Sequence, residues 1–314
     1  MNIRNAFVLS LTIFAMCACN RGAKEVPVSD VDARKIASQI HEQAINKDDV
    51  YYSESFSSVQ FNTFTLNPYL HNKDYMKIVF SSRQNSVYQG VNTFQSADEE
   101  ILYSYKEGYV KQKTKYVYQG RTGVGEYYFF KKGNECWFAG SREGDKGKDL
   151  LIEDLSSVET NFLLLSAHHY GASYFIRPFY NVLPIMPLTI AKEVDIPLKA
   201  QERPEYHKIT RGFYSSGDGS LTASYKYDVN DGEYLDCPLT KYYVLAPGYN
   251  LWTDLFISIS WENYFPTAFT LRGTNVYINS SGENTDSIDY EIDIKITYNK
   301  FEITYPNLDD YPQM

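Results

Sequence analysis

The chain contains few of the residues on which metal, redox and nucleic-acid sites depend. Its 314 residues include four cysteines, five histidines and three tryptophans, and the formal net charge is −9. Since no cluster of lysine and arginine offsets this charge, we expect no nucleic-acid partner. His168 and His169 are adjacent, and side chains on neighbouring helical positions point about 100° apart, so the pair could not chelate one ion. We therefore expect no metal and no cofactor.

Residues 1–18 are predicted to be a signal peptide. A short apolar run follows Arg4, too short to anchor the chain by spanning a bilayer, and it ends in Met16-Cys17-Ala18-Cys19. This ending resembles the bacterial lipoprotein signal, in which a small residue precedes the cysteine that is cleaved and acylated. Ala18 fits that position, so Cys19 is the predicted lipidation site. The lipid would anchor the protein to a membrane outside the cytoplasm. An ordinary secretory signal is the alternative.

Besides Cys17 and Cys19, only Cys136 and Cys237 remain. Outside the cytoplasm they could form one disulfide, which would stabilise the fold by roughly 4 kcal/mol in the chain-entropy model. Two buried free thiols are the alternative. Neither cysteine has the spacing of a zinc or redox motif.

Alternating apolar and polar residues fill two blocks, 51–140 and 205–305, and predict antiparallel strands joined by short turns. Aromatic residues make up 16% of the chain, which is typical of strands that pack rings against their neighbours. The clearest strand is 286–298, with isoleucines on one face and charged side chains on the other. Phe301, Ile303 and Tyr305 resume the alternation shifted by one residue, so Asn299-Lys300 is expected to be either a tight turn or a bulge, with the strand pattern continuing to 305.

Helices are predicted before and between the blocks. Residues 19–28 lack periodicity and are expected to be a flexible tether, after which Ser29 is a candidate N-cap of a helix with a narrow face of small side chains. Residues 148–171 carry a wide apolar stripe at helical spacing and are predicted to form a central helix across the concave side of a curved antiparallel sheet. The stripe comprises Leu151, Leu155, Val158, Phe162 and Leu165.

Residues 172–204 are apolar but broken by five prolines, which predicts an irregular segment. Such a segment must lie against apolar surface, either as a crossover that completes the core or as a mobile lid or cavity rim. Phe175, Phe179 and Met186 belong to it.

The order of these elements, the lipidation signal and the ending EIDIKITYNKFEITYPNLDDY resemble lipoproteins of the LolA and LppX type. That resemblance implies a single α+β domain, residues 29–314, in which an incomplete β-barrel wraps around a central helix. It also implies that lipid acyl chains are held between the sheet and the helix.

The leading functional hypothesis is a membrane-anchored lipoprotein without catalytic activity that binds an apolar ligand, a lipid or a lipidated partner. The ligand-binding site would be lined by Leu151, Leu155, Val158, Phe162, Leu165, Phe175, Phe179 and Met186. The alternative is a cell-surface protein with a filled core that binds glycan or protein through exposed aromatics, for which Trp137, Trp252 and Trp261 are candidates. An enzyme ranks third, because no catalytic constellation is evident. Asn20 and Arg21 after Cys19 provide no acidic export tag, which favours the periplasmic face over the cell surface.

Overall fold

The computed structural model describes most of the two strand blocks and the helix before them. The described residues are 24–43, 47–55, 58–61, 73–88, 90–104, 106–118, 120–142, 144–152, 185–193, 207–229, 235–236, 251–278 and 284–314. The predicted signal peptide, residues 1–18, and Cys19 lie outside them.

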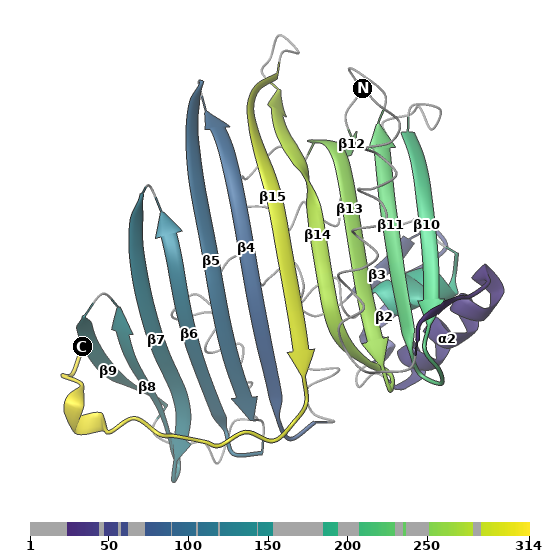
Figure 1. Ribbon diagram of the computed structural model, residues 1–314. Coiled ribbons are helices and arrows are strands. Elements are labelled where there is room, and N and C mark those ends of the chain that lie inside the picture. The colour runs from purple at the N-terminus through teal and green to yellow at the C-terminus, as the bar shows by residue number, and fades with distance from the viewer. Residues whose placement is uncertain are drawn as a thin grey trace.

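Most of the described part of the chain forms one open antiparallel sheet (Figure 1). Thirteen of the described strands belong to this sheet. Across the sheet they are β1 (Val26–Pro27), β10 (His207–Ser215), β11 (Leu221–Val229), β13 (Leu251–Glu262), β14 (Phe265–Ile278), β15 (Asn284–Thr297), β4 (Met76–Tyr88), β5 (Val91–Ser104), β6 (Tyr109–Tyr118), β7 (Arg121–Lys132), β8 (Glu135–Arg142) and β9 (Asp145–Ile152); β12 (Leu235–Asp236) pairs with β13. The prediction of an antiparallel sheet is confirmed, and the described architecture is mostly β.

The two strand blocks meet at the pairing of β15 with β4, an antiparallel ladder without register shifts. Ile294 lies opposite Phe80 and Ile296 opposite Ile78, and all four side chains are buried. Because side chains alternate along each strand, this pairing puts the apolar faces of both strands on the same side of the sheet. The blocks therefore share one sheet, as expected.

We call the side of the sheet that carries these residues the inner face. Its core extends over both blocks and includes Ile101, Phe129, Leu271, Ile257 and Tyr227. The opposite, outer face carries the charged side chains of the same strands. On β15, Tyr290, Ile292, Ile294 and Ile296 are buried, whereas Asp289, Glu291 and Lys295 are exposed.

The helix α2 (Asp30–Gln43) agrees with the prediction. Ser29 caps it, since the Ser29 Oγ accepts a hydrogen bond from the Asp32 N–H at 3.2 Å. Its small face packs against β10 and β11, with Ala33 and Ala37 completely buried. The tether prediction is wrong at its end, because β1 pairs with the last residues of β10 and the Val28 N–H donates to Phe213 O at 3.0 Å.

The proline-rich segment is not irregular throughout, because residues 185–191 are helical. Pro187 falls in the first turn of this short helix, where its missing N–H has no helical partner to lose. Met186 and Ile190 join the core of the large sheet, and Leu188 packs against the separate hairpin of β2 (Val50–Ser53) and β3 (Ser58–Phe61).

The predicted central helix is wrong at its start. Residues 148–152 belong to β9, which pairs with β8 through Trp137 opposite Leu150 and Phe138 opposite Asp149. The apolar run Leu150-Leu151-Ile152 is compatible with both helical and strand periodicity. It forms a strand here because it pairs with β8. Residues 153–171 lie outside the described part of the chain.

The final segment, residues 298–314, leaves the sheet and crosses the lower ends of β5 to β8 (Figure 1). We call it the outer strap, and it includes the short helix η3 (Leu308–Asp310). Phe301 and Ile303 therefore do not continue the strand pattern. Instead they pack with Tyr311 on the outer face, against Tyr109, Tyr128 and Phe130. At its end the strap adds backbone hydrogen bonds to the edge strand β9, Lys148 N to Pro312 O at 2.8 Å and Met314 N to Lys148 O at 3.0 Å.

Two strand boundaries also differ from the sequence pattern. The pattern predicts separate runs at 268–271 and 275–278, but both lie in the single strand β14. The glycine-rich stretch 120–125 is a turn only at its start, and β7 begins at Arg121. Gly90 and Gly120 follow a Tyr-Gln pair at two hairpin tips and have φ of 78° and 75°, which a glycine adopts without steric cost.

Candidate functional site

Five buried polar side chains cross the inner face. Their relative exposures are 1% for Ser82, 3% for Gln84, 4% for Glu99, 6% for Gln112 and 4% for Asn275. They come from four strands, β14, β4, β5 and β6, and each has the same alternation as the core residues of its strand. We call this set the polar row. Burying polar groups in a sheet face is costly unless they are hydrogen-bonded.

The strand register places the polar row along a diagonal. Gln84 on β4 lies opposite Tyr290 on β15. Ser82 is also on β4, two residues before Gln84. Glu99 on β5 lies between Phe80 and Thr114 on its neighbouring strands. The amide Nε2 of Gln112 donates to Glu99 Oε2 at 3.1 Å and to Thr114 Oγ1 at 3.4 Å.

Part of the polar row is unsatisfied. Ser82 Oγ, Gln84 Nε2 and Asn275 Nδ2 are buried without a hydrogen-bond partner among the described residues. A buried polar atom left unpaired costs about 1–3 kcal/mol. Native proteins contain few such atoms, and a cluster of three on one face is the kind of exception that a bound group would remove.

The polar row is also a border. Below it, toward the lower ends of the strands in Figure 1, the inner face is apolar, with Ile78, Ile101 and Ile296 buried side by side. Above it, Ser86, Thr93 and Gln95 occupy inward-facing positions of β4 and β5 and are only half-buried, while Ala97 and Val91 on the same side of β5 are apolar. The inner face is thus amphipathic.

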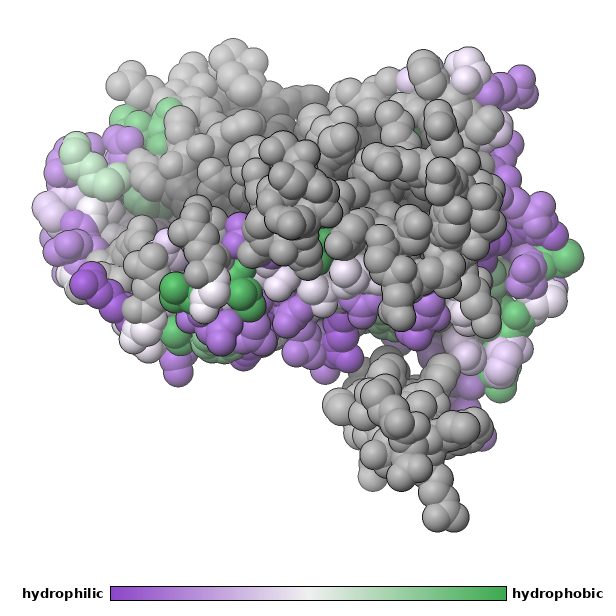
Figure 2. Space-filling view, turned by 90° about the horizontal axis from the view of Figure 1, so that it is seen from above, coloured by the Kyte–Doolittle hydropathy of each residue, from purple (hydrophilic) through white to green (hydrophobic). Residues whose placement is uncertain are grey.

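The basic side chains of the central strands all point to the other side. In the described parts of β4, β5, β6, β14 and β15, every lysine and arginine has the alternation of the outer face: Lys77, Arg83, Lys111, Lys113, Lys115, Arg272 and Lys295. There they pair with acids of adjacent strands, for example Arg83 with Asp98 at 2.8 Å and Arg272 with Glu291 at 3.1 Å. Figure 2 shows the molecule from above, with the outer face of the sheet along the lower border. The coloured side chains there are mostly hydrophilic. Glu99 is the one charged residue that is buried in the described core.

A second polar cluster lies on the outer face beside the outer strap. Lys111 Nζ is 3.0 Å from Glu126 Oε1, and the Tyr128 hydroxyl donates to the same oxygen at 3.0 Å. Burial works against the charge of Lys111, but the contacts with Tyr128 and Glu126 outweigh it and raise the Lys111 pKa. Burial likewise opposes the charge of Glu126, yet its hydrogen bonds to Lys111 and Tyr128 hold its pKa below the ordinary value. This cluster is fully paired and serves to join β6 to β7.

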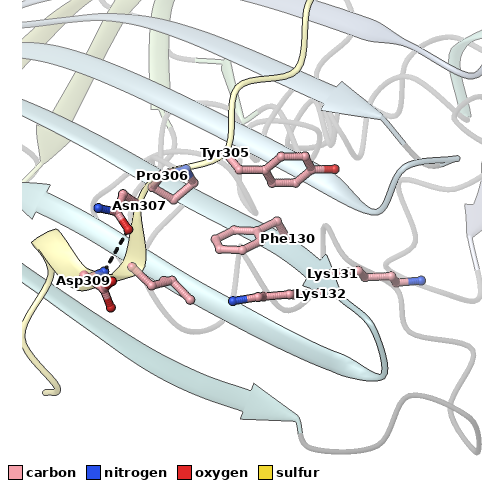
Figure 3. Close-up of a pocket in the computed structure, with 8 residues that line it drawn as sticks. Phe130, Lys131, Lys132, Tyr305, Pro306, Asn307 and Asp309 are labelled. Atoms are coloured by element: carbon pink, nitrogen blue, oxygen red, sulfur yellow. Dashed lines mark hydrogen bonds between the residues drawn. The ribbon is translucent and has the colours of Figure 1, made fainter.

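A pocket of about 350 Å³ lies between the end of β7 and the outer strap (Figure 3). The rings of Phe130 and Tyr305 meet there, with their centroids 5.5 Å apart. Lys131, Lys132 and Asp309 are exposed at its rim. Nothing in this geometry selects a ligand, so the pocket is a crevice formed where the strap crosses the strand.

Two of the eight predicted ligand-lining residues are described. Leu151 lies on β9 and packs against the core, and Met186 is completely buried in the short helix. Outside the described residues lie Leu155, Val158, Phe162, Leu165, Phe175 and Phe179.

Of the other candidate residues, Cys136 is a buried free thiol, and burial raises its pKa to about 11. Cys237 lies outside the described residues. Trp261 is a core residue with 1% exposure, and the Trp137 indole N–H donates to Glu135 at 2.8 Å. Within the described chain no three His, Cys, Asp or Glu side chains are grouped to hold a metal ion.

Sequence reasoning missed the polar row. The alternation Met76, Ile78, Phe80 continues to Ser82 and Gln84, and this continuation was the available signal. Polar residues at inward positions are readily taken for the solvated end of a strand, and only the packing shows that they are buried.

Comparison with known proteins finds no matching family model and no curated protein similar to the chain. None of the helices in the described residues is long and apolar enough to cross a membrane.

Proposed function

We propose that this protein is an extracytoplasmic lipoprotein, anchored to a bacterial membrane through Cys19, that binds an apolar ligand against the inner face of its sheet. The ligand is a lipid or the lipid part of a lipidated partner. In this proposal the sheet is one wall of a half-barrel, as in the LolA and LppX type. No catalytic step is required of it.

The observation that carries the proposal is the amphipathic inner face. A sheet that only needed a filled core would gain from apolar residues at Ser82, Gln84 and Asn275, since each leaves a buried polar atom unpaired among the described residues. A ligand with an apolar chain and a polar end would lie along Ile78 and Ile296 and satisfy these atoms.

The alternative of a glycan- or protein-binding surface has less support. It requires aromatic side chains exposed together on the outer face, but Trp261 is buried in the core and Trp137 is half-buried and hydrogen-bonded. The outer face is instead dominated by paired charges.

The proposal has two parts that can be tested separately. Native mass spectrometry of the full chain, purified from its host membrane in mild detergent, should show an adduct that organic extraction identifies as a lipid or acylated molecule. Protein without any adduct, which also fails to take up added lipid, would refute the binding function. For the anchor, Cys19→Ser should prevent incorporation of labelled fatty acid and release the protein from the membrane fraction, whereas Cys17→Ser should leave the attachment intact.

A further inference from the structure

We propose that the lower end of the sheet in Figure 1, where the β10–β11 and β13–β14 turns lie, faces the phospholipid membrane that carries the Cys19 anchor. Aromatic rings and lysines at this end contact the lipid head groups. This inference rests on the anchor of the proposed function and adds the orientation of the domain on its membrane. Its basis is the place where the described chain begins, together with the side chains that gather at the same end.

The first described residues leave the sheet at its lower end. Val26 pairs with Ser215, the last residue of β10, so the residues before Val26 run past the end of that strand. The Glu25 carboxylate accepts a hydrogen bond at 2.7 Å from the hydroxyl of Thr222, the second residue of β11. The described chain therefore begins beside the β10–β11 turn.

Covalent geometry limits where the anchor can lie. Lys24 is five residues after Cys19, and an extended chain spans at most about 3.6 Å per residue, so their Cα atoms lie within about 18 Å of each other. The sheet is much longer in this direction, because β4 has 13 residues, which at about 3.3 Å per residue amounts to about 43 Å. The anchor thus belongs to the lower end, and the tip of the β4–β5 hairpin lies beyond its reach.

Aromatic rings and lysines gather at this end, and we call them the end cluster. Phe265 begins β14 and Tyr298 follows β15, with their ring centroids 5.5 Å apart. Lys73 precedes β4, and its Nζ is 4.1 Å from the Phe265 centroid and 5.7 Å from that of Tyr298. Beside them, Lys300 Nζ is 6.0 Å from the centroid of Tyr75. The end cluster therefore joins three rings to two ammonium groups.

This combination suits the interface between lipid and water. The three rings are half-buried and Lys300 is exposed. Aromatic rings are favoured at the depth of the head groups, where one side of the ring meets apolar surface and the other meets water. A lysine can keep its methylene groups against such rings while its ammonium group reaches phosphate oxygens. The end cluster can therefore contact both parts of a phospholipid surface.

The lower end does not select anionic lipids. Exposed acids lie beside the end cluster, namely Asp74, next to Lys73, and Glu262, at the end of β13. They offset the positive charge of the two lysines, so long-range attraction to an anionic membrane is weak. We therefore expect the contact to form on a zwitterionic membrane, once the anchor holds the domain there.

The test measures how close three exposed positions lie to the membrane surface. Glu262→Cys, Lys226→Cys or Asn92→Cys provides one thiol for a fluorophore, in a chain that also carries Cys237→Ser and in which Cys136 is buried. Each acylated full chain is purified from its host and reconstituted in vesicles of dioleoylphosphatidylcholine. The loss of emission is then measured when the vesicles contain a lipid with a nitroxide quencher on its head group.

The three positions distinguish the possible orientations. Glu262 is at the lower end of β13, whereas Lys226 on β11 lies opposite Phe256, six residues or about 20 Å higher. Asn92 follows the tip of the β4–β5 hairpin. We expect strong quenching at Glu262, little at Lys226 and none at Asn92. A domain lying on its β10 edge or on its outer face would show quenching at Lys226 as strong as at Glu262, and contact through the hairpin tips would quench Asn92 most; each result would overturn the inference.

Two matched substitutions test the end cluster. Lys73→Glu places a negative charge against the phosphates and should reduce the quenching at position 262. Lys115→Glu makes the same change at an exposed position on β6, far from the lower end, and should leave the quenching as it was. A folded Lys73→Glu protein with unchanged quenching would refute the role of the end cluster. The three fluorophore positions are compared with Lys73 intact, so a Lys73→Glu protein that fails to fold does not weaken the test of orientation.

The outcomes also separate this inference from the proposed function. A chain without fatty acid on Cys19 would overturn both the anchor and the orientation. Acylated protein with equal quenching at all three positions would overturn the orientation and leave the anchor standing. The expected order of quenching in a protein that takes up no lipid ligand would support the orientation while the binding function fails.

Discussion

Phe80 of β4 and Ile294 of β15 lie directly opposite each other, although they belong to different strand blocks that are far apart in the sequence. Both are 1% exposed on the inner face. Their contact lies at the seam where the first strand block joins the second, so the two blocks should fold and unfold as one unit.

The first prediction concerns this seam. Ile294→Ala should lower the free energy of unfolding by about 2–5 kcal/mol, because it removes buried methyl groups and leaves a cavity. Lys295→Ala, on the exposed face of the same strand, should change it by less than about 0.5 kcal/mol. Urea unfolding followed by fluorescence measures both. Two separate transitions in the wild-type protein would contradict a shared sheet.

The second prediction concerns the edge of the sheet. Residues 312–314 pair with Lys148 and cover the backbone of β9, and exposed strand edges promote association between chains. Removing these three residues should increase self-association, measured by size-exclusion chromatography with light scattering. Met314→Ala keeps the backbone hydrogen bonds and should remain like the wild type. An unchanged mass distribution after the deletion would show that this edge is protected in another way.

The third prediction concerns pH. The Glu126 pKa is lowered in the folded state, so its contribution to stability is present above the ordinary value of 4.5 and is lost as the pH falls through the lower, folded value. The Lys111 pKa is raised, so its contribution is present below 10.5 and is lost at higher pH. Glu126→Gln should therefore flatten the acid side of the stability profile, and Lys111→Met the alkaline side.

A double-mutant cycle provides the control for this pair. If Lys111 and Glu126 stabilise the protein through their mutual contact, the double mutant should be more stable than the sum of the single effects implies. Additive effects in urea unfolding at pH 7 would mean that the two residues act independently.

The fourth prediction concerns Cys136. Burial raises its pKa to about 11, so the reactive thiolate is scarce at pH 8 and inaccessible to reagents. Iodoacetamide should leave Cys136 unmodified in the native protein and alkylate it after unfolding in urea without reductant, as peptide mass spectrometry would show. Protection that persists in urea until a reductant is added would instead demonstrate a disulfide.

Local patterns predicted the elements in which each residue faces either core or water. The strand Tyr109–Tyr118 and the capped helix Asp30–Gln43 match their sequence patterns because alternation and capping are local properties. Phe301 and Ile303 alternate in the same way and yet lie in the outer strap. An alternating segment can pair with a strand or lie across a sheet, and local periodicity does not distinguish the two.

The sequence by itself determined the antiparallel strands and the first helix, because these depend on spacing and composition. Only the tertiary structure decided that β4 pairs with β15, that residues 148–152 form an edge strand and that Ser82, Gln84 and Asn275 are buried. Partner choice and burial depend on contacts between distant segments, whose loop-closure cost and packing gain are properties of the whole fold.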